Sequence, residues 1–164
     1  MSELEKVARR FLRMNMLAQI FLADIARAEM TPIDSIEVLR EGLAGDRYAR
    51  GIGSFSKGLK DGRAITLIAG ETIDFLKAEH GVDWGNGEHR RNLVTRGVDL
   101  DSLVHVRFRI GGAVLRGNRR CPPCGYLSKL TGADAKALLH RRGGLRADVI
   151  EPGRIAVGDA IERI

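Results

Sequence analysis

The stretch Arg119-Arg120-Cys121-Pro122-Pro123-Cys124-Gly125-Tyr126-Leu127 separates a predicted β-hairpin from the helix and strands that follow it. Pro122 and Pro123 fix two consecutive φ angles and remove two backbone donors, so this segment fits neither a helix interior nor a central strand. We therefore predict a stiff loop that presents two thiols. The rest of the chain is expected to form a scaffold with a polar pocket facing this loop.

A Cys-x-x-Cys loop suits three chemistries. Zinc needs further Cys, His or carboxylate ligands, and the four histidines include no pair with H-x3-5-H spacing. Thioredoxin-like exchange needs a βαβ frame, whereas hairpin patterns surround this loop. The third is a single thiolate that ligates a soft metal or carries sulfur, with Arg119 and Arg120 holding it ionised. Two buried, reduced cysteines without chemistry are the remaining alternative.

Composition predicts one domain of the soluble globular class, because the 164 residues are 44% hydrophobic and 29% charged. The longest apolar run, 16–25, contains Asp24 and is too short for a membrane span. We see no signal peptide and expect a cytoplasmic protein with reduced cysteines. The net charge is +6, but aromatic residues are few and no nucleic-acid motif is present, which favours an anionic small molecule over nucleic acid as partner.

Hydrophobic periodicity predicts many short strands, separated by glycine-rich turns, and a few helices. Helices are expected at 2–13, 71–80 and 133–139, with one helical turn at 100–103. Strands are expected within 17–29 and at 33–40, 64–69, 93–95, 104–110, 113–116, 147–151, 154–157 and 160–164, the first two as a hairpin or bent pair. The pattern favours a mostly β, α+β fold with a barrel-like core and about three peripheral helices.

The first helix is amphipathic, with apolar residues recurring along one face. Ser2 and Glu5 form a plausible capping box at its start. We expect this helix to pack its apolar face on the domain, because its polar face is mixed in sign and unlike that of a membrane anchor.

Two polar segments are candidates for ligand contact. Residues 41–62 are glycine-rich and predicted as loop, without the Gly-Lys-Ser/Thr of a phosphate-binding loop. Arg47 in this loop suits bidentate anion binding, with an ion pair to Asp46 as the alternative. Strand alternation before Leu93 would point Arg90 and Asn92 to one side, where they suit a planar heterocycle and an anion. A solvated charge cluster at an edge strand is the alternative.

Several motifs together resemble the MOSC domain, the C-terminal domain of molybdenum cofactor sulfurases, which also occurs as free-standing bacterial proteins. They stand in the same order in this chain: 42–49, 91–100, Cys121-Pro122-Pro123-Cys124, 142–147 and Val157-Gly158-Asp159. The resemblance starts near Ile20, so we expect 1–15 to be an N-terminal helical extension and 16–164 the MOSC domain. It implies a closed or partly closed β-barrel with peripheral helices.

The resemblance also implies binding of a molybdenum–molybdopterin cofactor, an anionic ligand with a terminal phosphate. Cys124 matches the cysteine that ligates molybdenum in members that reduce N-hydroxylated compounds, so it is the expected metal ligand and catalytic residue. The other expected cofactor contacts all lie in or beside the matching motifs: Arg47, Arg90, Asn92, Thr95, Arg120 and Cys121. Of these, Cys121 is expected in a supporting or packing role.

Two functions follow from the resemblance. The first is reduction of a small N-hydroxylated substrate with electrons from an external reductase. The second is a sulfur or cofactor carrier in which Cys124 holds a persulfide, received from a donor protein and passed to an acceptor. A binding module without chemistry is a third, weaker candidate. The chain shows no pyridoxal-phosphate desulfurase domain and no reductase domain, so the reductase or sulfur donor is expected to be a separate partner.

Overall fold

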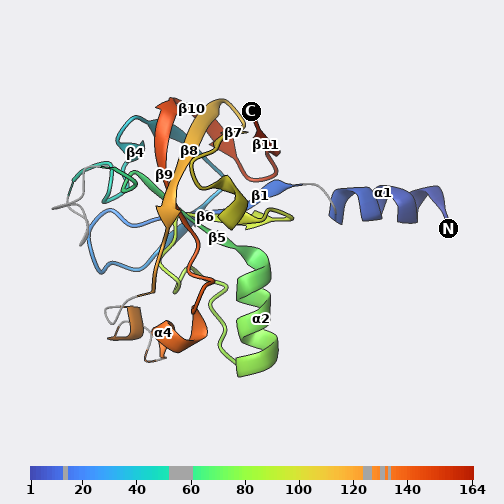
Figure 1. The fold of residues 1–164 in the computed structure, drawn as a ribbon, viewed down its shortest axis with the longest axis horizontal. Helices are drawn as coiled ribbons and strands as arrows, with labels where there is room; N and C mark the ends of the chain where they lie inside the picture. The colour runs from blue at the N-terminus through green and yellow to red at the C-terminus, as the bar shows by residue number, and fades with distance from the viewer. Residues whose placement is uncertain (13–14, 52–60, 124–126, 130–131, 133) are drawn as a thin grey trace.

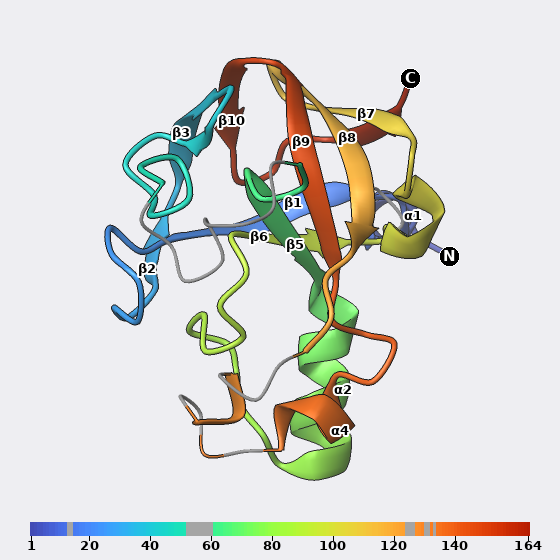
Figure 2. The same cartoon turned by 60° about the vertical axis from the view of Figure 1, so that its left-hand side comes forward.

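The computed structural model describes residues 1–12, 15–51, 61–123, 127–129, 132 and 134–164, with the backbone alone at 8–12. Two β-sheets form the body, α2 and α4 lie together beyond one end of them, and α1 extends away from the body (Figures 1 and 2). The helices are α1 (Glu3–Leu12), α2 (Gly70–His80) and α4 (Ala135–Leu138), with a 3-10 turn η1 (Leu100–Leu103). The mostly β prediction is confirmed.

The larger sheet has the strand order β11-β7-β8-β9-β5-β6-β1-β2. Its strands are β1 (Met16–Leu22), β2 (Thr31–Ile33), β5 (Ile65–Ala69), β6 (Leu93–Arg96), β7 (Arg107–Ile110), β8 (Ala113–Arg120), β9 (Leu145–Glu151) and β11 (Ile161–Arg163). The smaller sheet, ordered β10-β3-β4, contains β3 (Ser35–Leu39), β4 (Gly42–Leu43) and β10 (Gly153–Ala156). Strands β5 and β6 are parallel, and α2 makes the crossover that a parallel pair requires.

The predicted closed or partly closed barrel is not confirmed, because the ladders of the described residues leave the larger sheet open. One isolated bridge, Met16 to Ala160, and backbone hydrogen bonds of Leu17 with Gly158 and Asp159 join the start of β1 to the segment before β11. The remainder of that edge of β1 pairs with β2, at Ile20–Ile33 through Leu22–Thr31. Only the first residues of β1 are therefore left for the chain that approaches from β11.

The predicted pairing of 17–29 with 33–40 is wrong in its partner strand. The partner of β1 is the short strand β2, which contains Pro32, whereas β3 pairs with β10 in the other sheet. Proline lacks a backbone donor and is tolerated here because β2 is the edge strand. Tertiary pairing thus splits the predicted second strand at Asp34.

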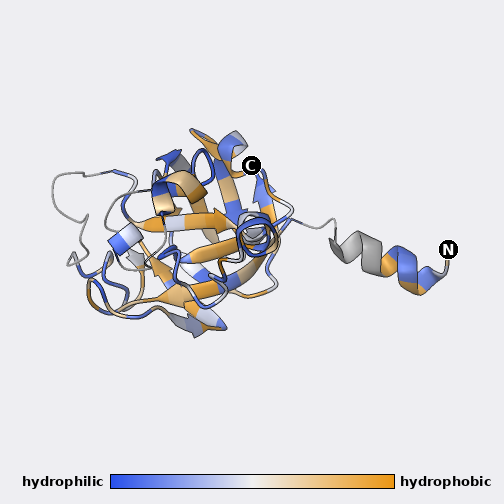
Figure 3. Cartoon of the chain, turned by 90° about the horizontal axis from the view of Figure 1, so that it is seen from below, coloured by the Kyte–Doolittle hydropathy of each residue, from blue (hydrophilic) through white to orange (hydrophobic). Residues whose placement is uncertain are grey.

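Strand alternation separates two apolar cores. Leu93 packs into the core that lies among the strands, and its neighbour Val94 packs into a second core with Phe21, Trp84 and residues of α2 and α4. Figure 3 shows the mainly hydrophobic strands at the centre of the body. Trp84 is 2% exposed and packs within this second core.

The capping box of α1 is confirmed: the Ser2 nitrogen donates to Glu5 Oε2 at 2.9 Å, and the Glu5 nitrogen donates to Ser2 Oγ at 3.1 Å. The prediction that this helix packs on the domain is wrong for its described side chains. Leu4 is 82% exposed and Val7 47%, as expected for a helix that extends away from the sheets (Figure 1). The boundary between 1–15 and 16–164 stays a prediction.

The remaining helices and hairpins follow the sequence closely. Gly81 ends α2 in the left-handed conformation, with its N–H directed to the carbonyls of the last turn. The hairpin through Gly111-Gly112 is confirmed by the β7–β8 pairing, and the turn at 100–103 by η1. Across the described segments, no helix has both the length and the apolar character needed to span a membrane.

Candidate functional site

The segment His89–Asn92 is hydrogen-bonded to three separate loops, around Ala28, Arg47 and Gly143. Arg90 has a φ of +67°, a conformation that bulky residues adopt rarely and that clusters at functional sites. Strand β6 begins only at Leu93, so strand alternation does not apply to Arg90 and Asn92, and the prediction that it aligns them is wrong. We call residues 89–92 the hub, because their side chains or backbone bond to these three loops and to the neighbouring strands.

Asn92 is fully buried and its side-chain amide is engaged within the sheet. Its Oδ1 accepts from the Thr66 nitrogen at 3.3 Å and from Thr66 Oγ1 at 3.2 Å, while its Nδ2 donates to the Phe21 carbonyl at 3.2 Å. The amide therefore joins β1 and β5 to the start of β6. A cofactor contact by Asn92 stays a prediction, and the structure gives it a positioning role.

Arg47 is buried and forms the ion pair that was the alternative to ligand binding. Its Nη1 lies 3.2 Å from Asp46 Oδ1, and its guanidinium stacks 4.4 Å from the Tyr48 ring centroid. Its Nη2 donates to the carbonyl of Arg90 at 3.2 Å. The structure thus brings Arg47 and Arg90 together, as predicted from widely separated motifs, but through a guanidinium that is already paired.

Arg90 lines a cavity of about 810 Å³ between the loop before β2 and the loop after α2. Its Nη1 donates to the carbonyl of Ala28 in the first of these loops. The cavity is lined by residues of both loops and by one residue of the segment that follows the cysteine loop: Arg27, Ala28, Glu29, Met30, Val82, Asp83, Trp84, Asn86, Gly87, Glu88, Arg90 and Gly132. Because Gly132 lines it, the cavity lies near the segment that follows the cysteine loop.

Arg91 is the hub residue that the sequence reasoning missed. It is 8% exposed, and its Nε donates to the Gly143 carbonyl at 2.9 Å and its Nη1 to the His89 carbonyl at 3.3 Å. Its Nη2 has no hydrogen-bond partner, and within the described part of the chain no carboxylate forms a salt bridge with it. The Arg90-Arg91 doublet was visible in the sequence, but nothing in it told which arginine would be buried.

The turn at Gly143-Gly144 connects Arg91 to the cysteine loop. The Cys121 nitrogen donates to the Gly144 carbonyl at 2.8 Å, and a Cβ at Gly143 would lie 2.0 Å from the Cys121 carbonyl oxygen. Cys121 is 1% exposed, in agreement with its expected packing role. Cys124 lies outside the described residues, so its roles as metal ligand and catalytic residue stay predictions.

The two arginines before the cysteine loop lie in β8 and have separate partners. Arg120 forms an exposed ion pair with Asp101 of η1 at 3.1 Å, whereas Arg119 Nη1 donates to the Asp61 carbonyl at 2.9 Å. Arg120 is therefore engaged with η1 in this structure. The Oγ1 of Thr95, on β6, is buried without a hydrogen-bond partner.

His89 holds Arg91 in place and is neutral. Burial, followed by the charges of Arg91 and Arg90, lowers the pKa of His89 to about 3. Its Nδ1 accepts from the Arg91 nitrogen at 2.9 Å, which requires an unprotonated Nδ1. Together with the bond from Arg91 Nη1 to its carbonyl, this makes His89 the positioning residue for both the backbone and the guanidinium of Arg91.

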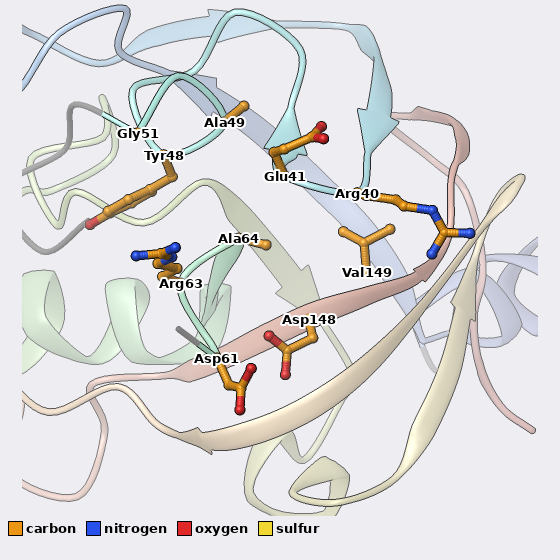
Figure 4. Close-up of a pocket in the computed structure, with 10 residues that line it drawn as sticks. All are labelled: Arg40, Glu41, Tyr48, Ala49, Gly51, Asp61, Arg63, Ala64, Asp148 and Val149. Carbon is orange, nitrogen blue, oxygen red and sulfur yellow. The ribbon is translucent and has the colours of Figure 1, made fainter. Parts of the chain in front are cut away.

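A second cavity, of about 500 Å³, contains none of the predicted site residues (Figure 4). Asp61 and Asp148 lie side by side on one wall, and Arg63 lies next to Tyr48. Asp148 accepts from the Gly62 nitrogen at 2.6 Å and from Asn118 Nδ2 at 2.9 Å, so it supports the chain before β5. This mixed-charge cavity suits an anionic ligand less well than the hub.

Among the described residues, no group of three or more His, Cys, Asp or Glu side chains is arranged to hold a metal ion. The described hub instead offers arginine donors and backbone carbonyls.

Comparison with solved structures supports the fold. The YuaD protein from Bacillus subtilis is 19% identical with a TM-score of 0.75, covering 92% of this chain and 96% of that one. The YiiM protein from Geobacillus stearothermophilus is 15% identical with a TM-score of 0.72, covering 92% of this chain and 75% of that one. For YiiM from Escherichia coli the identity is 18%, the TM-score 0.64, and the coverage 91% and 69%.

Comparison by sequence identifies the family. No curated protein matches the chain. The profile of the MOSC domain matches residues 55–162, which is more than half of the chain and includes the hub, the cysteine loop and the Gly143-Gly144 turn. The chain belongs to the MOSC domain family.

Proposed function

We propose that this protein binds a molybdenum–molybdopterin cofactor, with Cys124 as the metal ligand, and reduces small N-hydroxylated compounds. Electrons would come from an external reductase in the cytoplasm. The observation that carries the proposal is one continuous set of hydrogen bonds, from Arg47 through the hub to the turn that holds Cys121. Motifs far apart in sequence thus converge beside the one loop that contains both thiols.

The residues present fit an anionic cofactor in charge and in hydrogen-bonding capacity. Arg91 is a buried guanidinium without a carboxylate partner among the described residues, and one of its nitrogens is unsatisfied. A buried, uncompensated cation is costly, and an anionic ligand removes that cost. Arg90 lines the adjoining cavity, and the buried Thr95 Oγ1 is a further unsatisfied group in the same motif.

When bound, the cofactor supplies the two-electron redox chemistry, and the protein supplies binding and orientation. Cys124 would hold the metal, and Arg91 and Arg90 would hold anionic and polar groups of the cofactor. His89 keeps Arg91 in position, and Asn92 fixes the segment that carries both arginines to β1 and β5. The prolines before Cys124 restrict the backbone of its loop, which limits the positions its thiolate can take.

The test is cofactor content. The full chain is purified from a host that makes the cofactor, and bound molybdenum and pterin are measured for the wild type, Cys124→Ser and Cys121→Ser. Loss of the thiolate ligand should reduce molybdenum at least tenfold in Cys124→Ser. Cys121→Ser, which changes a neighbouring buried thiol, is the matched control and should retain most of the metal.

Equal molybdenum in the wild type and in Cys124→Ser would refute the ligand assignment. A persulfide on Cys124 in protein without molybdenum would instead support the sulfur-carrier function. If the wild type does bind molybdenum, turnover of an N-hydroxylated base with an artificial reductant should be detectable and absent in Cys124→Ser.

A further inference from the structure

We infer that Arg91 forms a buried binding site for a phosphate-type oxyanion, next to the Gly143-Gly144 turn that holds Cys121. The inference rests on the proposed function only for the source of the oxyanion, which is either the phosphate group of a bound cofactor or a free anion. Arg91 is not among the residues that the resemblance to the MOSC family assigned to the cofactor. Burial, geometry and charge lead to it.

The charge of Arg91 is not balanced by any described carboxylate. Arg91 is 8% exposed, and an arginine keeps its charge in proteins. The described hydrogen-bond partners of its guanidinium are carbonyl oxygens, which carry only partial charges. No carboxylate of the described chain pairs with it. By comparison, the similarly buried Arg47 pairs with Asp46. A buried cation with only carbonyl partners favours an anionic ligand.

The guanidinium of Arg91 is held in one orientation. Two carbonyls, of Gly143 and His89, hold Nε and Nη1, so the plane of the guanidinium is fixed. The donors that remain unsatisfied belong to Nη2. A guanidinium whose orientation is already fixed loses little further entropy when an anion binds. The orientation of the guanidinium is thus fixed before a ligand arrives.

Arg91 lies beside the Gly143-Gly144 turn, which also holds the start of the cysteine loop. The same turn accepts from Arg91 at Gly143 and from the Cys121 nitrogen at Gly144. Two hydrogen bonds therefore connect the Arg91 site to the start of the cysteine loop. His89 contributes by positioning, since its Nδ1 and its carbonyl both accept from Arg91.

The experiment uses the full chain purified without cofactor and inorganic phosphate as the probe. Thermal unfolding is followed in phosphate and in sodium chloride at equal ionic strength. For the wild type we expect phosphate at about tenfold above its dissociation constant to raise Tm by roughly 3–5 °C. Arg91→Gln should lose this rise, whereas Arg109→Gln, at an exposed position on β7, should keep it.

A merely structural role would lower the Tm of Arg91→Gln but leave the phosphate-dependent difference intact, and that result would overturn the inference. No phosphate effect on the wild type would overturn it as well. If Arg91→Gln shows no thermal transition, Arg91→Lys replaces it. Lysine keeps the charge but lacks the fork that holds two carbonyls and an anion together, so its apparent phosphate affinity should fall several-fold. Unchanged affinity would refute the site.

The source of the oxyanion is separated with cofactor-loaded protein. If the phosphate group of the cofactor fills the site, loaded wild type should show no Tm rise in phosphate. A rise equal to that of the cofactor-free protein identifies a free anion instead. Should molybdenum never bind, the proposed function fails, and an Arg91-dependent phosphate effect still establishes the oxyanion site.

Discussion

At the scale of single residues, the doublet Arg90-Arg91 shows how one backbone conformation separates two like side chains. Arg90 is left-handed, and its guanidinium contacts the Ala28 carbonyl, whereas that of Arg91 contacts the Gly143 carbonyl. Each arginine thereby fastens a different loop to the hub. Sequence spacing selected Arg90 and Asn92, and burial with uncompensated charge selects Arg91.

At the same scale, the buried His89 predicts how the stability of the protein depends on pH. Its folded pKa is about 3, below the ordinary value of about 6.5, so between these values the unfolded chain binds a proton that the folded chain does not. The stability linked to neutral His89 is fully present above pH 6.5 and falls as pH decreases towards 3. Between pH 7 and pH 5 we expect this residue to account for about 2 kcal/mol of destabilisation.

Urea unfolding of His89→Asn at pH 7 and pH 5 measures this contribution. Asparagine keeps an acceptor for the Arg91 nitrogen but does not titrate, so the pH-dependent loss should be about 2 kcal/mol smaller than in the wild type. His140→Asn, at an exposed histidine, serves as the control and should match the wild type. Identical pH dependence in wild type and His89→Asn would refute the neutral assignment.

At the scale of elements, glycines determine where loops approach strands. Gly144 has a φ of +101°, and a Cβ there would lie 1.9 Å from the Leu67 carbonyl oxygen of β5. Gly158 has nearly the same φ, +97°, but open space around the Cβ position. The two glycines share a positive φ, which would strain any residue with a Cβ, but only Gly144 lies close to another backbone segment.

Alanine substitution at these glycines should therefore have unequal effects. Gly158→Ala adds strain alone and should cost about 1 kcal/mol. Gly144→Ala adds a backbone clash and should cost roughly 3 kcal/mol or more. Equilibrium unfolding of both variants gives the comparison, and equal losses would contradict the close approach of the turn to β5.

At the scale of the whole molecule, α1 stands apart from the sheets (Figure 1). Its described apolar side chains, Leu4 and Val7, are exposed, so its removal costs no buried contact of those residues. Deletion of residues 1–12 should change Tm by less than about 2 °C. Deletion of 161–164 removes β11, with Ile161 buried against the core, and should lower Tm by well over 5 °C. Thermal unfolding measures both changes in Tm. A large decrease in Tm on deleting residues 1–12 would show that α1 packs on the body.

The sequence alone determined the local structure and the family. Glycine and proline place the turns, and alternation places the strands, because these signals act within a few residues. The motifs predicted the meeting of Arg47 and Arg90 and the packing of Cys121. Only the tertiary structure decided that β3 joins the second sheet, that the larger sheet stays open, and that Asn92 is held by Thr66 and Phe21.

The same division holds within the candidate site. Which arginine is exposed and which is buried depends on partners that lie far away in sequence: Asp101 takes Arg120, and Gly143 holds Arg91. Hydrogen bonds and charge pairs are short-range in space and not in sequence, so spacing along the chain cannot rank the arginines. The cysteine loop was evident from the sequence, and the buried cation beside it emerged only from the fold.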